Sequence, residues 1–254
     1  MAARSRYPRI LRSTILLCSL ALFSCGRARD SVQHGTLRYN ISDIFATDAK
    51  SLSLSRAAGS GRTDEIKRLV LDGAAVNAVG MEEITPLWWA LWADNFDGFE
   101  ALLRLGANPN APRRMGLPIM HLAANNPDSR FLQAALRFGG NPDEIDVAAQ
   151  TTLLYRPIRG GLDRNVEILL AAGANVNAVE PYSGRILPMI AITANTNFRL
   201  AYQLVVRGAD VNKKTTNGET LADIVASVKP IPGTEQEMWK AKILDYFKTQ
   251  GSSL

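Results

Sequence analysis

Apolar residues recur along this chain as pairs of short helical stripes, and a glycine follows each pair. In one unit, Leu87 and Leu91 fall on one helical face, and Leu102 and Leu103 fall on a second. Spacings of three and four residues are typical of amphipathic helices. The pattern therefore predicts two short helices in each unit, and Gly106 follows the second.

The glycines that follow these stripes return at a nearly fixed interval. They are Gly73, Gly106, Gly139, Gly173 and Gly208. The intervals are 33, 33, 34 and 35 residues, and each glycine opens a Gly-Ala/Gly-x-Pro/Val-Asn element or a close variant of it. A fixed period of this length indicates a repeat architecture. Because a helix commonly ends in a left-handed residue, Gly106 and Gly173 are predicted to have positive φ.

The unit of 33 residues opens with Thr-Pro-Leu at residues 85–87 and closes with Leu-Leu-Arg-Leu-Gly-Ala at residues 102–107. It resembles the ankyrin repeat, a β-turn followed by two antiparallel helices. Pro86 fits the first turn of a helix, where a missing N–H is tolerated. The resemblance covers residues 50–250. It implies an all-α ankyrin-repeat solenoid of about six repeats including caps, in one elongated domain.

Individual repeats depart from this pattern. Repeat three, which opens at Pro118, carries His121 where the family has a histidine that ties neighbouring hairpins together. Repeat four, which opens at Thr152, has Pro157 in place of a buried alanine, so its first helix is expected to be shortened or bent. The hairpin at residues 178–186 is two residues longer than the others. Residues 235–250 are expected to form a longer helix that closes the stack.

Residues 1–24 have the pattern of an export signal. Four arginines precede an apolar core at residues 13–24, which is shorter than the roughly 20 residues needed to span a bilayer. The core runs into Leu-Phe-Ser-Cys-Gly at residues 22–26, which resembles the bacterial lipobox and implies lipidation of Cys25. Residues 25–49 then read as the lipidated cysteine and a flexible tether.

The alternative is an ordinary secretory signal in which Cys25 has no role. Cysteine usage favours the anchor, because the other cysteine, Cys18, lies in the removed segment. The mature chain would then have no intramolecular disulfide despite its export. Gly26 follows Cys25 at the position where an aspartate would resemble an inner-membrane retention signal. We therefore expect the protein to be anchored to the periplasmic face of the outer membrane, with the inner membrane as the alternative.

The formal charge of +5 belongs to the precursor. Without residues 1–24 the chain keeps 25 basic and 24 acidic residues, a balance of about +1. Nucleic-acid binding would require a basic stripe on the mature domain, and we expect none.

No constellation of catalytic or metal-ligating residues stands out. The chain has two histidines: one in the tether and His121 in a structural position. Residues 59–63 carry glycines but lack the lysine of a phosphate-binding loop. We therefore expect no enzyme activity, no cofactor and no metal, although scattered Ser/Asp pairs leave an unrecognised catalytic site as an alternative.

Surface recognition is the remaining function class. In ankyrin stacks the hairpin tips and the exposed faces of the first helices form one surface, here called the concave wall. The resemblance places eleven candidate protein-binding residues on it: Met81, Glu82, Trp89, Trp92, Arg114, Met115, Asn125, Asn126, Arg159, Tyr182 and Arg185. Trp88 replaces the family's histidine and is expected in the core. Trp92 is either a binding hot spot or packed on a neighbouring tip.

Exported ankyrin lipoproteins of this architecture resemble immunity proteins that neutralise antibacterial effectors such as secreted phospholipases. We therefore expect a lipid-anchored protein-binding module, monomeric when free, whose partner is a cognate effector or toxin. The alternatives are a scaffold or assembly partner of a periplasmic enzyme, and an envelope-stress factor with an unrecognised catalytic site.

Overall fold

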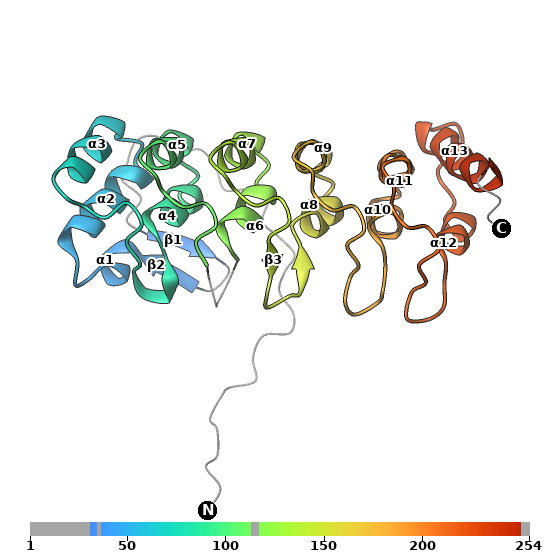
Figure 1. Ribbon diagram of the computed structural model, residues 1–254, viewed down its shortest axis with the longest axis horizontal. Helices are drawn as coiled ribbons and strands as arrows, with labels where there is room; N and C mark the ends of the chain where they lie inside the picture. The colour runs from blue at the N-terminus through green and yellow to red at the C-terminus, as the bar shows by residue number, and fades with distance from the viewer. Residues whose placement is uncertain (1–30, 35–36, 113–116, 250–254) are drawn as a thin grey trace, which may run out of the picture.

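The computed structural model describes residues 31–34, 37–112 and 117–249, and within them six pairs of antiparallel helices follow one another in a row (Figure 1). The first helices of the pairs are α2 (Ala49–Gly59), α4 (Pro86–Trp92), α6 (Ile119–Ala124), α8 (Tyr155–Gly160), α10 (Leu187–Asn195) and α12 (Leu221–Ser227). The second helices are α3 (Thr63–Leu71), α5 (Phe96–Arg104), α7 (Ser129–Arg137), α9 (Asp163–Ala171), α11 (Phe198–Val206) and α13 (Glu235–Thr249). The predicted all-α solenoid is confirmed.

The described parts of the hairpins between the pairs project to the same side, below the helices in Figure 1. The first carries the short 3-10 helix η1 (Met81–Glu83), and the one before α8 contains strands β3 (Ile145–Asp146) and β4 (Thr151–Thr152). These strands are antiparallel, with Ile145 opposite Thr152. The longer hairpin before α10 is closed by an antiparallel bridge between Val179 and Ile186. The first helices and the hairpins therefore form one face of the stack.

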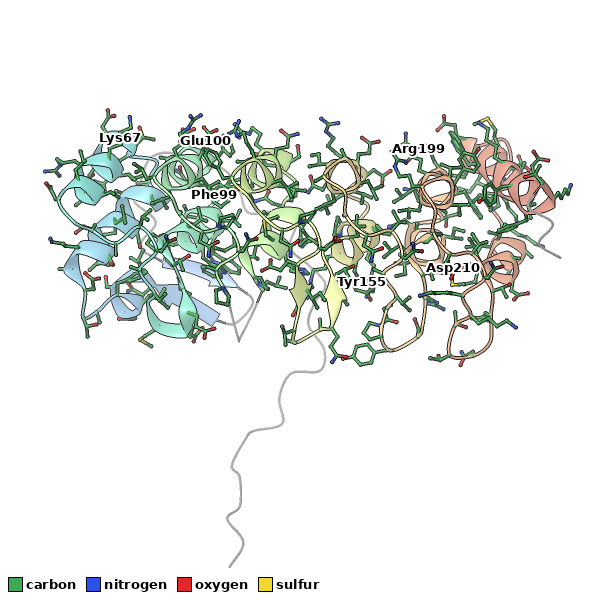
Figure 2. The ribbon with its side chains drawn as sticks, viewed as in Figure 1. Lys67, Phe99, Glu100, Tyr155, Arg199 and Asp210 are labelled. Atoms are coloured by element: carbon green, nitrogen blue, oxygen red, sulfur yellow. The ribbon has the colours of Figure 1, made fainter. Side chains whose placement is uncertain are left out.

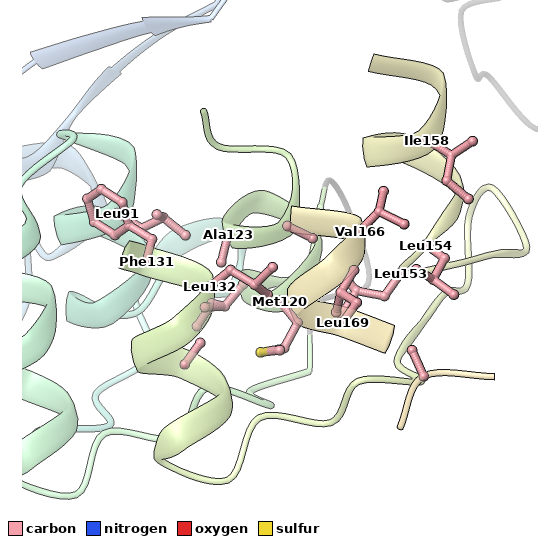
Figure 3. Close-up of a cluster of buried hydrophobic side chains, with 14 of the residues drawn as sticks. Leu91, Met120, Ala123, Phe131, Leu132, Leu153, Leu154, Ile158, Val166 and Leu169 are labelled. Atoms are coloured by element: carbon pink, nitrogen blue, oxygen red, sulfur yellow. The ribbon is translucent and has the colours of Figure 1, made fainter. Parts of the chain in front are cut away.

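One apolar core runs through the stack, because each helix pair covers the next. Figure 3 shows this around repeats two to four, where Met120 of α6 and Phe131 of α7 lie between residues of the flanking pairs. Both are buried, and the ring centroids of Phe131 and Phe99 of α5 are 5.2 Å apart. A unit alone could not bury these faces, so the fold depends on stacking.

Local signals set the ends of the helices. The Oγ1 of Thr85 accepts a hydrogen bond from the backbone N–H of Trp88 at 3.1 Å and caps α4, whose first residue is Pro86. A side-chain acceptor at this position satisfies a backbone donor that has no partner within the helix. At the other end of the pair, Gly106 has a φ of 89°, and Gly173 has a φ of 88°. The predicted positive φ values are confirmed.

Helix α8 comprises six residues, as many as α6, and Pro157 is the third of them. Contrary to the expectation from the sequence, α8 is therefore no shorter than α6. The first residues of a helix have N–H groups without an intrahelical acceptor, so proline costs no hydrogen bond there. The next residue, Ile158, donates its N–H to the carbonyl of Leu154 at 3.2 Å, so the backbone hydrogen bonds of the helix start directly after the proline.

Part of the segment predicted as a tether is folded. Strands β1 (Ser31–His34) and β2 (Leu37–Asn40) form an antiparallel pair, and helix α1 (Ile41–Ile44) follows directly. Ile41 and Phe45 are buried. Helix α1 packs against α2 and η1, where it covers the outer apolar face of the first repeat. The ordered domain therefore starts before residue 50, while the signal and Cys25 lie outside the described residues.

Helix α13 closes the other end of the stack. Ile243 and Phe247 are buried, and Trp239 lies against Tyr202 of α11 with ring centroids 5.5 Å apart. Met238 of the same helix is 46% exposed and does not contribute to this closure.

Candidate protein-binding surface

The tryptophans of α4 lie mainly in the core. Trp88 is 2% exposed, and its Nε1 donates to the Leu117 carbonyl at 3.4 Å. Trp92 is partly buried and stacks on Trp88, with ring centroids 4.7 Å apart. Trp88 thus reaches the next hairpin, as a histidine does at the equivalent position of repeat three. Only part of Trp92 is exposed at the surface.

Trp89 was predicted on the concave wall and is instead fully buried. Its indole lies against Gly59 of α2, where an added Cβ would come within 2.7 Å of the indole Nε1. Because Gly59 has no side chain, the first repeat leaves room for this large ring between α2 and α4. Trp89 is therefore a packing residue.

Met81 and Glu82 occupy the tip of the first hairpin, as predicted. Met81 is 60% exposed, and Glu82 is exposed with a φ of 54°. A positive φ is uncommon in residues other than glycine, so the backbone at this tip has an unusual turn conformation.

Repeat three supplies less of the predicted surface. Asn125 is exposed. Asn126 is engaged in a turn, because its Oδ1 accepts from the Asp128 N–H at 2.8 Å. Arg114 and Met115 lie outside the described residues, so their part in the wall stays a prediction.

The structure brings Arg159 and Arg185 together. A cavity of about 290 Å³ opens between α8, α10 and the hairpin that connects their repeats, and it is called here the two-arginine pocket. Its lining consists of Tyr155, Arg159, Glu180, Ser183, Arg185, Ile190, Thr193 and Ala194. Sequence reasoning named both arginines and missed Tyr155. The missed signal was its place four residues before Arg159, on the same face of one helix.

Exposed apolar side chains gather on the hairpin tips beside this pocket. Tyr182 is 75% exposed at the tip of the longer hairpin, and Val147 is 80% exposed on the preceding one. Val179 and Ile145 are exposed on the same two hairpins. Apolar and aromatic groups next to arginine are the composition found at protein-interface centres.

A buried polar cluster lies behind the wall at repeats three and four. His121 is fully buried, and its Nε2 is 3.1 Å from the Glu144 carbonyl oxygen, to which it donates. Burial lowers the pKa of His121 to about 4, so the ring is neutral at pH 7. Asp146, 3% exposed, pairs with Arg156 of α8 at 3.0 Å. The predicted tie between hairpins is present, and the sequence did not reveal the acidic residues around it.

The family model described as "Ankyrin repeat" matches residues 82–114, which span the first hairpin, α4 and α5. The same unit of hairpin and two helices recurs along the stack. The chain is an ankyrin-repeat protein.

Curated relatives share these repeats. The nuclear factor NF-kappa-B p105 subunit of Gallus gallus is 33% identical over 145 residues, 56% of this chain and 15% of the relative. The B-cell lymphoma 3 protein homolog of Mus musculus is 32% identical over 139 residues, 54% of this chain and 31% of the relative. Protein PhlB of Serratia liquefaciens is 30% identical over 125 residues, 49% of this chain and 55% of the relative. The chain therefore spans less than two thirds of each of them.

Ankyrin repeats make this chain a protein-binding module. Among the described residues, histidine, cysteine, aspartate and glutamate form no group of three or more that could hold a metal ion. None of the helices in that part of the chain is long and apolar enough to cross a bilayer. The absence of enzyme activity stays a prediction.

Proposed function

We propose that this ankyrin-repeat protein is a lipid-anchored periplasmic binding module that neutralises an antibacterial effector, such as a secreted phospholipase. One observation carries the binding part of the proposal. The two-arginine pocket and the exposed Tyr182 lie on adjacent elements of the concave wall, where one partner could bury both. Buried aromatic and arginine side chains are the most common hot spots of protein interfaces.

The anchor is proposed from the sequence around Cys25. A basic head, a short apolar core and a cysteine at the expected cleavage point together favour a bacterial lipoprotein. Multiple acyl chains give stable membrane attachment. An inhibitor held at the membrane would meet an effector that attacks phospholipids at its site of action. The bacterial source of PhlB, one of the relatives, is compatible with this assignment.

The partner is tested by affinity capture from the producing strain with the full-length protein. Tyr182→Ala should lose the partner, because truncating an aromatic hot spot typically costs about 2–4 kcal/mol of binding. Lys67→Ala is the matched control, since Lys67 lies on α3 in the row of second helices, away from Tyr155 and the wall (Figure 2). A partner retained by Tyr182→Ala and by Arg159→Gln would place the interface elsewhere.

Immunity requires more than binding. The captured partner should be toxic when expressed in the periplasm without this protein, and co-expression of the parent should restore growth. A captured enzyme that is harmless, or whose activity rises on binding, would instead favour the scaffold or assembly role and overturn the immunity proposal.

The anchor has a separate test. Palmitate labelling of the parent should be positive, and Cys25→Ser should give an unlabelled product that is unprocessed or soluble. Labelling that persists in Cys25→Ser would remove the lipid anchor from the proposal and leave the binding module.

A further inference from the structure

The two-arginine pocket holds one guanidinium in a defined position. Arg159 donates from Nη1 to the hydroxyl of Tyr155 at 3.0 Å, and its Cζ lies 5.6 Å from the centroid of the same ring. Both residues are on α8, one turn apart. Contact with the ring and its hydroxyl restricts the rotamers of a long and otherwise exposed side chain, which lowers the entropy lost when a ligand binds.

The second guanidinium has unused hydrogen-bonding capacity. Arg185 is partly buried, and its Nε is buried without a hydrogen-bond partner in the described part of the structure. A buried donor left unsatisfied costs free energy that a ligand could recover. Arg185 comes from the hairpin before α10, so the pocket combines arginines from two repeats.

The charge of Glu180 attracts Arg185, but among the described residues its carboxylate makes no hydrogen bond to that guanidinium. Glu180 is the acidic side chain among the lining residues, and its oxygens are engaged by its own turn. Oε2 accepts from the Ser183 N–H at 2.7 Å and from the Ser183 hydroxyl, and Oε1 accepts from the Tyr182 N–H at 3.3 Å. Two guanidinium groups therefore face one carboxylate that is already bonded, and the pocket keeps an excess of positive charge.

The size of the pocket restricts its ligand. A volume of about 290 Å³ lies at the lower limit of small-molecule sites, which span about 300–1,000 Å³. Ile190 and Ala194 of α10 add an apolar side to the lining. A short side chain with an apolar stem and an anionic head suits both the space and the chemistry.

We propose that the two-arginine pocket binds the carboxylate of an aspartate or glutamate side chain presented by the protein partner. Arginine binds planar carboxylates through paired N–H donors, and these charge-assisted bonds are among the strongest hydrogen bonds in proteins. The proposal rests on the proposed function in one respect, since it assumes a protein partner. The tip residue Tyr182 would contact the same partner beside the pocket.

The test uses the full chain and blocked peptides, so it does not depend on identifying the partner. Acetyl-Gly-Glu-Gly-amide is titrated while the Nε–Hε signals of Arg159 and Arg185 are followed by NMR, with acetyl-Gly-Gln-Gly-amide and inorganic phosphate as competing probes. The glutamate peptide should shift both signals saturably, and added salt should weaken its binding. The glutamine peptide should shift neither.

Variants test the assignment to this pocket. Arg159→Gln and Arg185→Gln should each weaken binding of the glutamate peptide at least about tenfold, as expected from the loss of a charged hydrogen bond. Arg164→Gln is the matched control, because Arg164 lies on α9 and pairs with Glu167 at 3.7 Å. If Arg185→Gln fails to fold, the exposed Arg159→Gln still decides the result.

Three outcomes would overturn the inference: equal shifts with the glutamine peptide, unchanged binding in Arg159→Gln, or tighter binding of phosphate than of the glutamate peptide. Failure of the proposed function gives a different pattern. In that case no partner is captured or none is toxic, while the glutamate peptide still binds the pocket.

Discussion

The side chain of Asn110 fastens its repeat to Gly139, the closing glycine of the next one. Its Nδ2 donates to the Gly139 carbonyl at 2.8 Å, and its Oδ1 accepts from the Asn141 N–H at 2.7 Å. One amide therefore satisfies an acceptor and a donor of the following repeat. A side-chain amide can do this because it carries both functions.

The same bridge occurs at other junctions. Asn77 donates to the Gly106 carbonyl at 3.0 Å and accepts from the Asn108 N–H at 2.8 Å. Asn177 bonds in the same way to Gly208 and Asp210. The exception is Asp143, whose carboxylate accepts from Asn175 at 2.7 Å but has no N–H to donate.

The bridge predicts the effect of Asn110→Asp. The substitution removes the donor to Gly139 and places a carboxylate against a carbonyl oxygen. We expect the free energy of unfolding to fall by about 0.5–1.5 kcal/mol, the net value of one hydrogen bond, because the exposed Gly139 carbonyl can bond to water instead. Urea denaturation followed by circular dichroism measures the change.

The reverse substitution is the control. Asp143→Asn supplies the missing donor to the junction between repeats three and four, so it should leave stability unchanged or raise it. Equal destabilisation by both variants would mean that the amide bridge does not hold the repeats together.

The closing glycines were predictable and the bridge was not. A helix end needs a left-handed residue whatever its neighbours are, so the position of Gly106 in its own unit is enough to predict its φ. The bonds of Asn110 depend on the next repeat. The sequence shows only that asparagines recur with the period of the repeat. Their hydrogen-bond partners cannot be identified until the packing of one repeat on the next is known.

Gly106→Val tests the helix end. Gly106 has a φ of 89°, and an added Cβ would meet nothing within 4 Å. The cost is therefore in the backbone alone, about 1–2 kcal/mol, and the Tm should fall by a few degrees. Gly106→Asn is the control, because asparagine tolerates the left-handed region and should cost less. If Gly106→Val and Gly106→Asn lower the Tm equally, backbone strain at positive φ would not be the cause of the loss.

Gly98→Ala tests the packing of the first two repeats. A Cβ on Gly98 of α5 would lie 1.9 Å from the carbonyl oxygen of Ala58 on α2, so the helices must separate. Overpacking of this kind costs about 1–3 kcal/mol or more. Gly160→Ala is the matched control, since the nearest atom, on Leu162, is 3.7 Å from the added Cβ. That variant should gain about 0.4–1 kcal/mol. Similar urea midpoints for both would contradict the close approach of α2 and α5.

The candidate site was predictable only in part, for a related reason. Position within the repeat was enough to place Arg159 and Arg185 on the wall, because they lie on an exposed helix face and a hairpin. Position within the repeat did not predict that Trp89 is buried, because this burial depends on Gly59 in the neighbouring repeat. Neighbouring repeats also decide the bonds of Asn195 on α10, whose side chain donates to the Ile158 carbonyl in the last turn of α8 at 2.7 Å.

Glu144 predicts how stability changes with pH. Its Oε2 is buried without a hydrogen-bond partner in the described structure, and burial together with the charge of Asp146 raises the pKa of Glu144 to about 7. The folded state therefore holds this proton more tightly than the unfolded state, whose pKa is near 4.5. The stability that this gives is complete below about pH 4.5 and is lost as the pH rises through about 7.

Glu144→Gln removes this titration but keeps the backbone carbonyl that accepts from His121. The free energy of unfolding of the variant, minus that of the parent, should therefore increase between pH 5 and pH 8, measured as urea midpoints at equal slope. His121 provides the internal control. Its pKa is lowered from 6.5 to about 4, so the stability that the neutral His121 ring contributes is lost as the pH falls from about 6.5 to about 4. This loss should be the same in the parent and in Glu144→Gln. A difference that stays constant from pH 5 to pH 8 would mean that the carboxyl of Glu144 reaches water in the folded protein and ionises there at its ordinary pKa.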